Sequence, residues 1–151
     1  MNVGIVVYSK TGNSLSVAEK VKKDLERKGF SVTMLAIEAS GEGPNTKIIN
    51  APDISSYDTL VFASPVQAFS LALPMKLYLE NMASLKDKKV FCFVTQHLKK
   101  SWMGGNHAVK QIKEECIKKE GSISYSGVVN WSSSKREDQI NEIVKTISSR
   151  L

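Results

Sequence analysis

Residues 3–14, which read VGIVVYSKTGNS, join an apolar run to six small, hydroxylated or glycine-type residues. Residues 3–8 are apolar and β-branched and predict a strand. Residues 14–28 predict a helix with Ala18, Val21 and Leu25 on one face, and Gly29 follows as a helix-ending glycine. An ordinary connection between a strand and a helix does not require this composition, so the stretch indicates that something fits against its backbone.

The same alternation continues along the chain. Further strands are predicted at residues 30–37, 57–64, 88–95 and 122–131, and further helices from Pro74, over 105–120, and to the end at Leu151. Ser134 and Glu137 predict a capping box at the start of the last helix. Residues 38–56 carry little periodicity, and a helix there is expected to be short or absent. Alternating strands and helices with short connections predict a parallel sheet covered on both faces. Ligands of such folds bind beyond the carboxyl ends of the strands, so the loops after the first, third and fourth strands form the predicted site.

The first of these loops has the chemistry of an anion site. Its hydroxyl and amide side chains precede a helix whose first N–H groups lack backbone partners, and Gly12 lets the backbone come close. Neither G-x-x-x-x-G-K-[ST] nor G-x-G-x-x-G occurs, which disfavours triphosphate and dinucleotide binding by those modes. Taken alone, a capped turn rich in hydroxyls explains the stretch equally well.

The pattern [ST]-x-T-G-x-[ST] after the first strand resembles the phosphate-binding loop of the flavodoxin family. YDTLVFASPVQAFSLALPMKLYLEN (57–81) and VFCFVTQHLKKSWMGGNHAVKQI (90–112) resemble that family's third and fourth strands with their flavin-facing loops. The resemblance covers nearly the whole chain and implies a flavodoxin-like, three-layer α/β/α sandwich of the short-chain form. Its five-stranded parallel sheet would have the order 2-1-3-4-5, and it would bind flavin mononucleotide (FMN) without a covalent bond.

The resemblance also implies which residues hold the cofactor. The phosphate would lie against Ser9, Lys10, Thr11, Gly12, Asn13 and Ser14. The flavin ring would lie between two loops, which contribute Ser64, Pro65, Val66, Gln67, Ala68 and Phe69, and Thr95, Gln96, His97, Trp102, Gly104 and Gly105. Phe69 and Trp102 either stack on the ring or serve as core or partly exposed aromatics. No catalytic or metal-binding residue is assigned, because the chemistry belongs to the flavin.

Two departures from the family bear on function. Shuttle flavodoxins are typically acidic around the ring, whereas here the expected rim carries five basic or histidine side chains and the three loops carry no acidic one. These rim residues are Lys10, His97, Lys99, Lys100 and His107. Such a rim favours an acidic redox protein or NAD(P)H as partner. The loop over residues 64–70 also lacks the glycine that commonly allows a peptide to turn toward the ring, so strong stabilisation of the one-electron-reduced flavin is not expected.

Length and composition agree with one domain over residues 1–151. The chain has a net charge of +6, 42% hydrophobic residues and no apolar run long enough for a membrane span. The N-terminus lacks the features of a signal peptide, which predicts a cytoplasmic protein with Cys92 and Cys116 reduced and buried. The lysines are spread over several helices, and nucleic-acid binding is not expected.

Two hypotheses for the function remain open. In the first, the protein acts in electron transfer or in NAD(P)H-dependent flavin reduction, and the sequence does not decide between an enzyme and a carrier. In the alternative, it is a flavin-free interaction or regulatory module.

Overall fold

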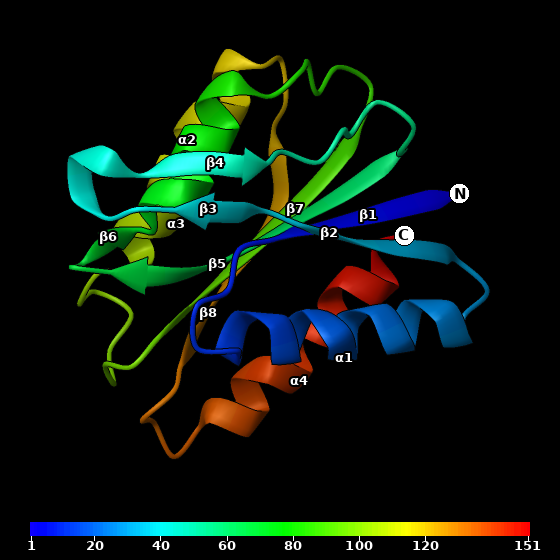
Figure 1. Ribbon diagram of the computed structural model, residues 1–151. Helices are drawn as coiled ribbons and strands as arrows, with labels where there is room; N and C mark the ends of the chain where they lie inside the picture. Colours follow the sequence, from blue (N-terminus) through cyan, green and yellow to red (C-terminus); the bar gives the residue numbers. More distant parts are fainter.

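A computed structural model describes all 151 residues and contains a twisted parallel sheet at its centre (Figure 1). The five parallel strands are β1 (Asn2–Val7), β2 (Ser31–Ala36), β5 (Thr59–Gln67), β7 (Lys89–Gln96) and β8 (Ile123–Asn130). Hydrogen bonding places them in the order β2-β1-β5-β7-β8. Because these are the first, second, third, fourth and fifth strands predicted, the expected order 2-1-3-4-5 is confirmed.

Helices cover both faces of the sheet. One layer contains α1 (Asn13–Arg27) and α4 (Arg136–Ser149), and the opposite layer contains α2 (Leu73–Asn81) and α3 (Gly105–Lys118) (Figure 1). The three-layer α/β/α sandwich is therefore confirmed. None of these helices combines the length and the apolar character that crossing a membrane requires.

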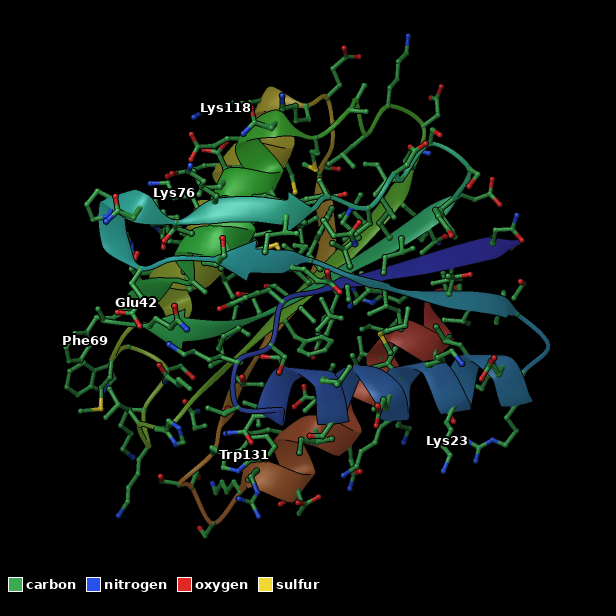
Figure 2. All side chains as sticks on the ribbon, viewed as in Figure 1. Lys23, Glu42, Phe69, Lys76, Lys118 and Trp131 are labelled. Atoms are coloured by element: carbon green, nitrogen blue, oxygen red, sulfur yellow. The ribbon has the colours of Figure 1, made fainter.

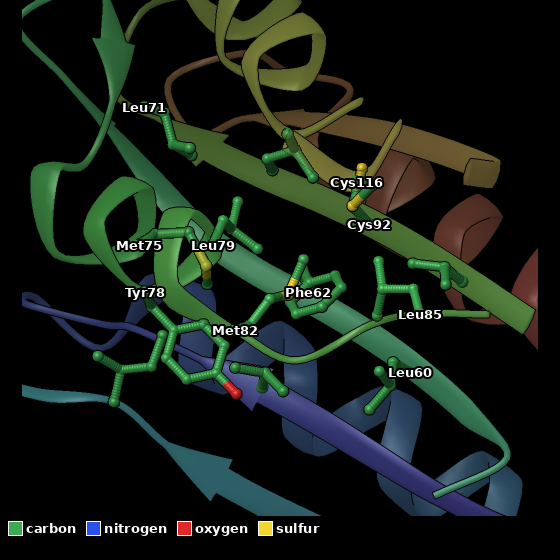
Figure 3. Packing of buried hydrophobic residues seen from close by; sticks show 14 of the residues in the cluster. Leu60, Phe62, Leu71, Met75, Tyr78, Leu79, Met82, Leu85, Cys92 and Cys116 are labelled. Atoms are coloured by element: carbon green, nitrogen blue, oxygen red, sulfur yellow. The ribbon is translucent and has the colours of Figure 1, made fainter. Parts of the chain in front are cut away.

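Each face of the sheet has its own hydrophobic core. Phe62 of β5 packs with Met75 and Leu79 of α2 on one side (Figure 3), and Val61 of the same strand packs with the α1 and α4 side on the other. A strand buried on both faces explains the nearly continuous apolar sequence of residues 59–64. Full burial of such a side chain stabilises the fold by ~1.5–3 kcal/mol.

Both cysteines lie in the core on the α2 and α3 side, as predicted. Cys92 of β7 and Cys116 of α3 are free thiols and completely buried (Figure 3). Burial raises the pKa of the Cys116 thiol to about 12 and raises the pKa of the Cys92 thiol further. Both are therefore protonated, unreactive core residues at neutral pH.

The irregular segment 38–56 contains no α-helix, as its lack of periodicity predicted. It forms an antiparallel hairpin from β3 (Glu38–Ser40) and β4 (Lys47–Asn50), joined through the 3₁₀ turn η1 (Gly43–Asn45). After this hairpin, the hydroxyl of Tyr78 in α2 donates to the carbonyl of Pro52 at 2.6 Å. Burial raises the pKa of Tyr78 to about 12. This contact fastens the end of the hairpin segment to α2.

The third predicted strand is longer than expected. Instead of ending at residue 64, β5 runs to Gln67 and pairs antiparallel with the short β6 (Ser70–Leu71). Ala68 and Phe69 form the two-residue turn between them with φ values of 49° and 62°. Two positive φ angles are typical of a type I′ hairpin turn, which normally selects Asn-Gly or similar pairs.

The start of α4 also differs from the prediction. Ser134 and Glu137 have the spacing of a capping box, but the helix begins at Arg136 with Lys135 before it and no side-chain cap. The hydroxyl of Ser133 instead accepts a hydrogen bond from the Lys135 N–H at 3.1 Å. The capping-box prediction was wrong because a turn at residues 133–135 delays the helix by one position.

Candidate functional site

The loop between β1 and α1 presents backbone N–H groups at a helix N-terminus. Gly12 has a φ of 95°, which favours glycine, and directs the chain into α1. The hydroxyl of Ser9 accepts from the N–H groups of Gly12 at 3.1 Å and Leu15 at 3.4 Å. The N–H groups of Asn13 and Ser14 have no partner within the protein, and no acidic residue occupies the first turn. The loop therefore remains open to an anion.

A buried hydrogen bond fixes this loop to the sheet. The hydroxyls of Ser14 and Thr95 lie 2.8 Å apart, and both residues are buried. The bond joins the first turn of α1 to the carboxyl end of β7, 81 residues further along the chain. The Ser14 side chain thus holds two of the predicted loops together, while its N–H group stays free.

The second predicted loop is the β5–β6 hairpin, and α3 holds it in place. The side-chain oxygen of Gln111 accepts from the Leu71 N–H at 2.8 Å and from the Ser70 hydroxyl at 3.0 Å. At the tip of the hairpin, Phe69 is 65% exposed. Figure 2 shows this ring at the edge of the molecule, where it is free to contact a ligand.

The third loop follows β7 and packs directly on the second. Gly104 has a φ of 122°, and a Cβ added there would lie 2.9 Å from the Cα of Phe69. Trp102, in the same loop, is 74% exposed, and His97 is exposed as well. The close approach at Gly104 requires glycine, so backbone packing sets the spacing between the two loops.

Gln96 forms the floor of this third loop. Its side-chain nitrogen donates to the carbonyl of Lys100 at 2.7 Å and to Asn130 Oδ1 at 2.6 Å. Its Oε1 is buried and has no hydrogen-bond donor. An unpaired buried acceptor is costly, and Ser148 Oγ is the one other buried side-chain polar atom without a hydrogen-bond partner.

The three loops meet at one small cavity of about 110 Å³. Its lining combines all three: Lys10, Thr11, Asn13, Pro65, Val66, Gln67, Thr95, Gln96 and His97. The remaining predicted residues do not line it: Ser9, Gly12, Ser14, Ser64, Ala68, Phe69, Trp102, Gly104 and Gly105. Of these, Ser14 and Ser64 are buried, whereas Phe69 and Trp102 are exposed.

A neighbouring cavity contains residues that the sequence did not indicate. About 420 Å³ in volume, it shares Lys10 and Gln67 with the first cavity and is lined in part by the hairpin tip from Gly41 to Gly43. Glu42 of this tip brings a carboxylate beside the basic rim. The only signal in the sequence was the pair of glycines in the irregular segment, and nothing there predicted where the tip would lie.

Comparisons with known proteins agree on the fold. No family model and no curated protein matches the sequence. Among solved structures, oxidised flavodoxin 2 from Bacillus cereus is similar with a TM-score of 0.73 and 18% identity, over 100% of both chains. A Fusobacterium nucleatum flavodoxin bound to flavin mononucleotide has a TM-score of 0.68 and 10% identity, covering 99% of this chain and 98% of that one. An azoreductase from Bacillus anthracis has a TM-score of 0.69 and 12% identity over 100% of both chains.

These similarities, together with the strand order and layers, define the fold as flavodoxin-like. The match covers 99–100% of this chain in each case.

Proposed function

We propose that this protein binds FMN non-covalently and transfers electrons, either as a carrier or in NAD(P)H-dependent flavin reduction. The observation that carries the proposal is the convergence of three separate loops, after β1, β5 and β7, on one cavity at the carboxyl edge of the sheet. Similar structures include a flavodoxin bound to FMN and an azoreductase, which supports both forms of the proposal.

The donor set fits the two ends of FMN. The free N–H groups of Asn13 and Ser14, with the hydroxyl of Thr11 and the ammonium of Lys10, suit a phosphate. At the other end, Gln96 lines the cavity, and its unpaired Oε1 suits a donor such as an imide N–H. The exposed rings of Phe69 and Trp102 would lie beside the flat ring system.

Each part of the site has its own task under this proposal. The α1 N-terminus binds the phosphate, Gly104 sets the gap between the ring-facing loops, and Ser14 with Thr95 holds the two ends in register. When bound, FMN supplies the redox chemistry. The protein orients it and provides a basic group, Lys10, at the cavity, with Glu42 of the hairpin tip in the neighbouring cavity that Lys10 also lines.

Titration of the purified protein with FMN tests the proposal. We expect saturable quenching of flavin fluorescence at micromolar protein, and a flavin absorbance that stays with the protein on gel filtration. Lack of quenching at micromolar levels would remove the proposal in favour of the flavin-free module. The narrowness of the cavity is the observation that favours this alternative.

A second measurement separates reductase from carrier. The FMN-loaded protein is mixed with NADH or NADPH without any other protein. Direct bleaching of the flavin indicates a reductase, whereas bleaching only after addition of a reductase protein indicates a carrier.

A further inference from the structure

A second polar cleft borders the β7–α3 loop and shares no lining residue with the proposed FMN cavity. It has a volume of about 540 Å³ and contains no hydrophobic and no acidic residue. Its walls come from residues 99–101 and from the β8–α4 connection. The lining consists of Lys99, Lys100, Ser101, Asn130, Ser132, Ser133, Ser134, Lys135 and Gln139.

The three lysines of this cleft have no anionic partner. No carboxylate lies within 4.0 Å of the ammonium of Lys99, Lys100 or Lys135. The nearby Glu137 of α4 is directed to Lys20 and Arg136 instead. Positive charge therefore gathers in the cleft without neutralisation, in contrast to the ion-paired lysines on α1 and α3.

The cleft is held in shape by a buried polar network. Asn130, only 3% exposed, accepts from Gln96 Nε2 at 2.6 Å and donates from Nδ2 to the Ser101 hydroxyl at 3.1 Å. Its backbone N–H donates to Gln139 Oε1 at 2.8 Å, which fastens the first turn of α4. These bonds join both walls, so the lysines are positioned on a preformed support.

Donor groups remain free around this support. The hydroxyls of Ser132 and Ser134 take part in no hydrogen bond within the protein, whereas that of Ser133 accepts from Lys135 N–H. Three ammonium groups and two free hydroxyls offer more hydrogen-bond donors than the two oxygens of one carboxylate can accept. Their number fits the larger set of oxygens of a phosphate or pyrophosphate. The lack of apolar lining argues against a protein-docking surface, whose core is normally apolar.

We propose that this cleft is a second anion site, which binds the phosphate or pyrophosphate group of a small phosphorylated molecule. Gln96 connects the proposed FMN cavity to this cleft. It lines the FMN cavity, and its Nε2 donates to Asn130 Oδ1 and to the Lys100 carbonyl, two residues that line the cleft. A phosphorylated molecule seated here would have its remaining part beside the β7–α3 loop. The proposal does not require FMN binding.

NMR titration of the protein saturated with FMN, or of the free protein if it binds none, tests the proposal with sodium pyrophosphate as the probe. We expect saturable shifts of the backbone amide signals of residues 99–101 and 132–135. Signals of residues 10–14 report separately on the phosphate end of the first site. Failure of FMN binding and failure of the second site are therefore distinguished in one experiment.

Two double variants with equal net charge form the matched pair. Lys99→Ala/Lys135→Ala should weaken pyrophosphate binding by about tenfold or more, because the variant removes two charge-assisted contacts to the anion. Lys23→Ala/Lys28→Ala removes two exposed, unpaired lysines of the α1 region and should leave affinity within about twofold. Ser132→Ala/Ser134→Ala removes the hydroxyls without changing charge and should also weaken binding.

The sources of the phosphate are distinguished by NADH, NADPH and AMP. A dinucleotide donor shifts the amides of the cleft and of residues 64–69 together, while a free phosphate or a mononucleotide shifts the cleft alone. Three outcomes would each overturn the proposal. They are amide shifts confined to residues 10–14, equal weakening of pyrophosphate binding by both lysine double variants, and binding that does not saturate by about 10 mM pyrophosphate, where affinity is too weak to be specific.

Discussion

At the scale of single residues, the two turn positions Ala68 and Phe69 have backbone angles that other residues adopt more easily. Each costs roughly 1–2 kcal/mol relative to glycine in the left-handed region. Strain of this kind collects where a local geometry serves a purpose other than stability. Here the strained turn carries an exposed aromatic ring next to the proposed flavin site.

The Ala68→Asn/Phe69→Gly variant should move stability and affinity in opposite directions. Asn-Gly suits a type I′ turn, so the free energy of unfolding should rise by about 1 kcal/mol. If Phe69 stacks on the flavin, FMN affinity should fall by about tenfold. Urea unfolding and FMN titration measure the two effects, with Ala68→Asn as the control that keeps the ring. Unchanged FMN affinity in the double variant would assign Phe69 no role in binding.

Gly104 should be sensitive to the smallest possible addition. In Gly104→Ala, the new methyl meets the backbone of Phe69 at 2.9 Å, so the loops must separate. We expect a loss of about 1–3 kcal/mol in the free energy of unfolding together with weaker FMN binding.

Gly29→Ala is the matched control for Gly104→Ala. Gly29 also has a positive φ, of 95°, but has no atom within 4 Å of an added Cβ. It should lose only about 1 kcal/mol from backbone strain and keep FMN affinity unchanged. Equal changes in FMN affinity for the two variants would contradict the role of Gly104 in spacing the loops.

At the scale of elements, the start of α1 and the end of β7 are joined by one buried hydroxyl pair. Ser14→Ala leaves the Thr95 hydroxyl unpaired and should destabilise the protein by about 1–2 kcal/mol. Adding Thr95→Val removes the orphaned hydroxyl, so the double variant should be more stable than the sum of single losses predicts. Chemical unfolding of all four proteins gives the coupling energy, and strict additivity would refute the link.

The hydrogen bond from Tyr78 of α2 to Pro52, after β4, should make the free energy of unfolding depend on pH in the alkaline range. Burial holds the Tyr78 proton in the folded protein up to a pKa of about 12, against an ordinary value of 10.0. Folded protein therefore binds this proton more tightly, and the stability it contributes is complete below pH 10 and is lost as pH rises toward 12.

Tyr78→Phe should accordingly cost about 1 kcal/mol at pH 7, by loss of the bond to Pro52, and should lose less stability than the parent between pH 10 and 12. Urea unfolding at pH 7 and pH 11 measures both effects. If the free energy of unfolding fell by the same amount between pH 7 and pH 11 in both proteins, the ionisation of Tyr78 would not contribute to the loss of stability.

The sequence predicts elements better than their ends and their contacts. Periodicity identified all five parallel strands, because a strand buried on both faces needs an apolar run. Periodicity did not identify β6, because a strand of two residues is too short to show a repeat. It also did not indicate that Ala68 and Phe69 would adopt left-handed backbone angles. The convergence of the three loops followed from topology, whereas the position of Glu42 and the bond between Ser14 and Thr95 depend on contacts distant in sequence.

At the scale of the whole molecule, the net charge of +6 should govern encounters with small redox agents. Reduced FMN-loaded protein should react with anionic ferricyanide at a rate that falls as ionic strength rises toward 0.1 M, where the screening length is about 10 Å. The rate with cationic hexaammineruthenium(III) should rise over the same range. Stopped-flow measurements test this, and identical salt dependence for the two oxidants would rule out a basic surrounding of the flavin.

The position of β1 between β2 and β5 affects how a nascent chain matures. β1 can pair with β2 once residues 31–36 have left the ribosome, but its other edge stays open until β5 follows at residues 59–67. The cavity at the edge of the sheet also requires β7, because Thr95 and Gln96 of that strand line it. The hydrogen bond between the Ser14 and Thr95 hydroxyls cannot form before β7 is in place. Any ligand of this cavity therefore meets a chain whose sheet is nearly assembled, and it stabilises the finished fold by mass action without guiding the earlier steps.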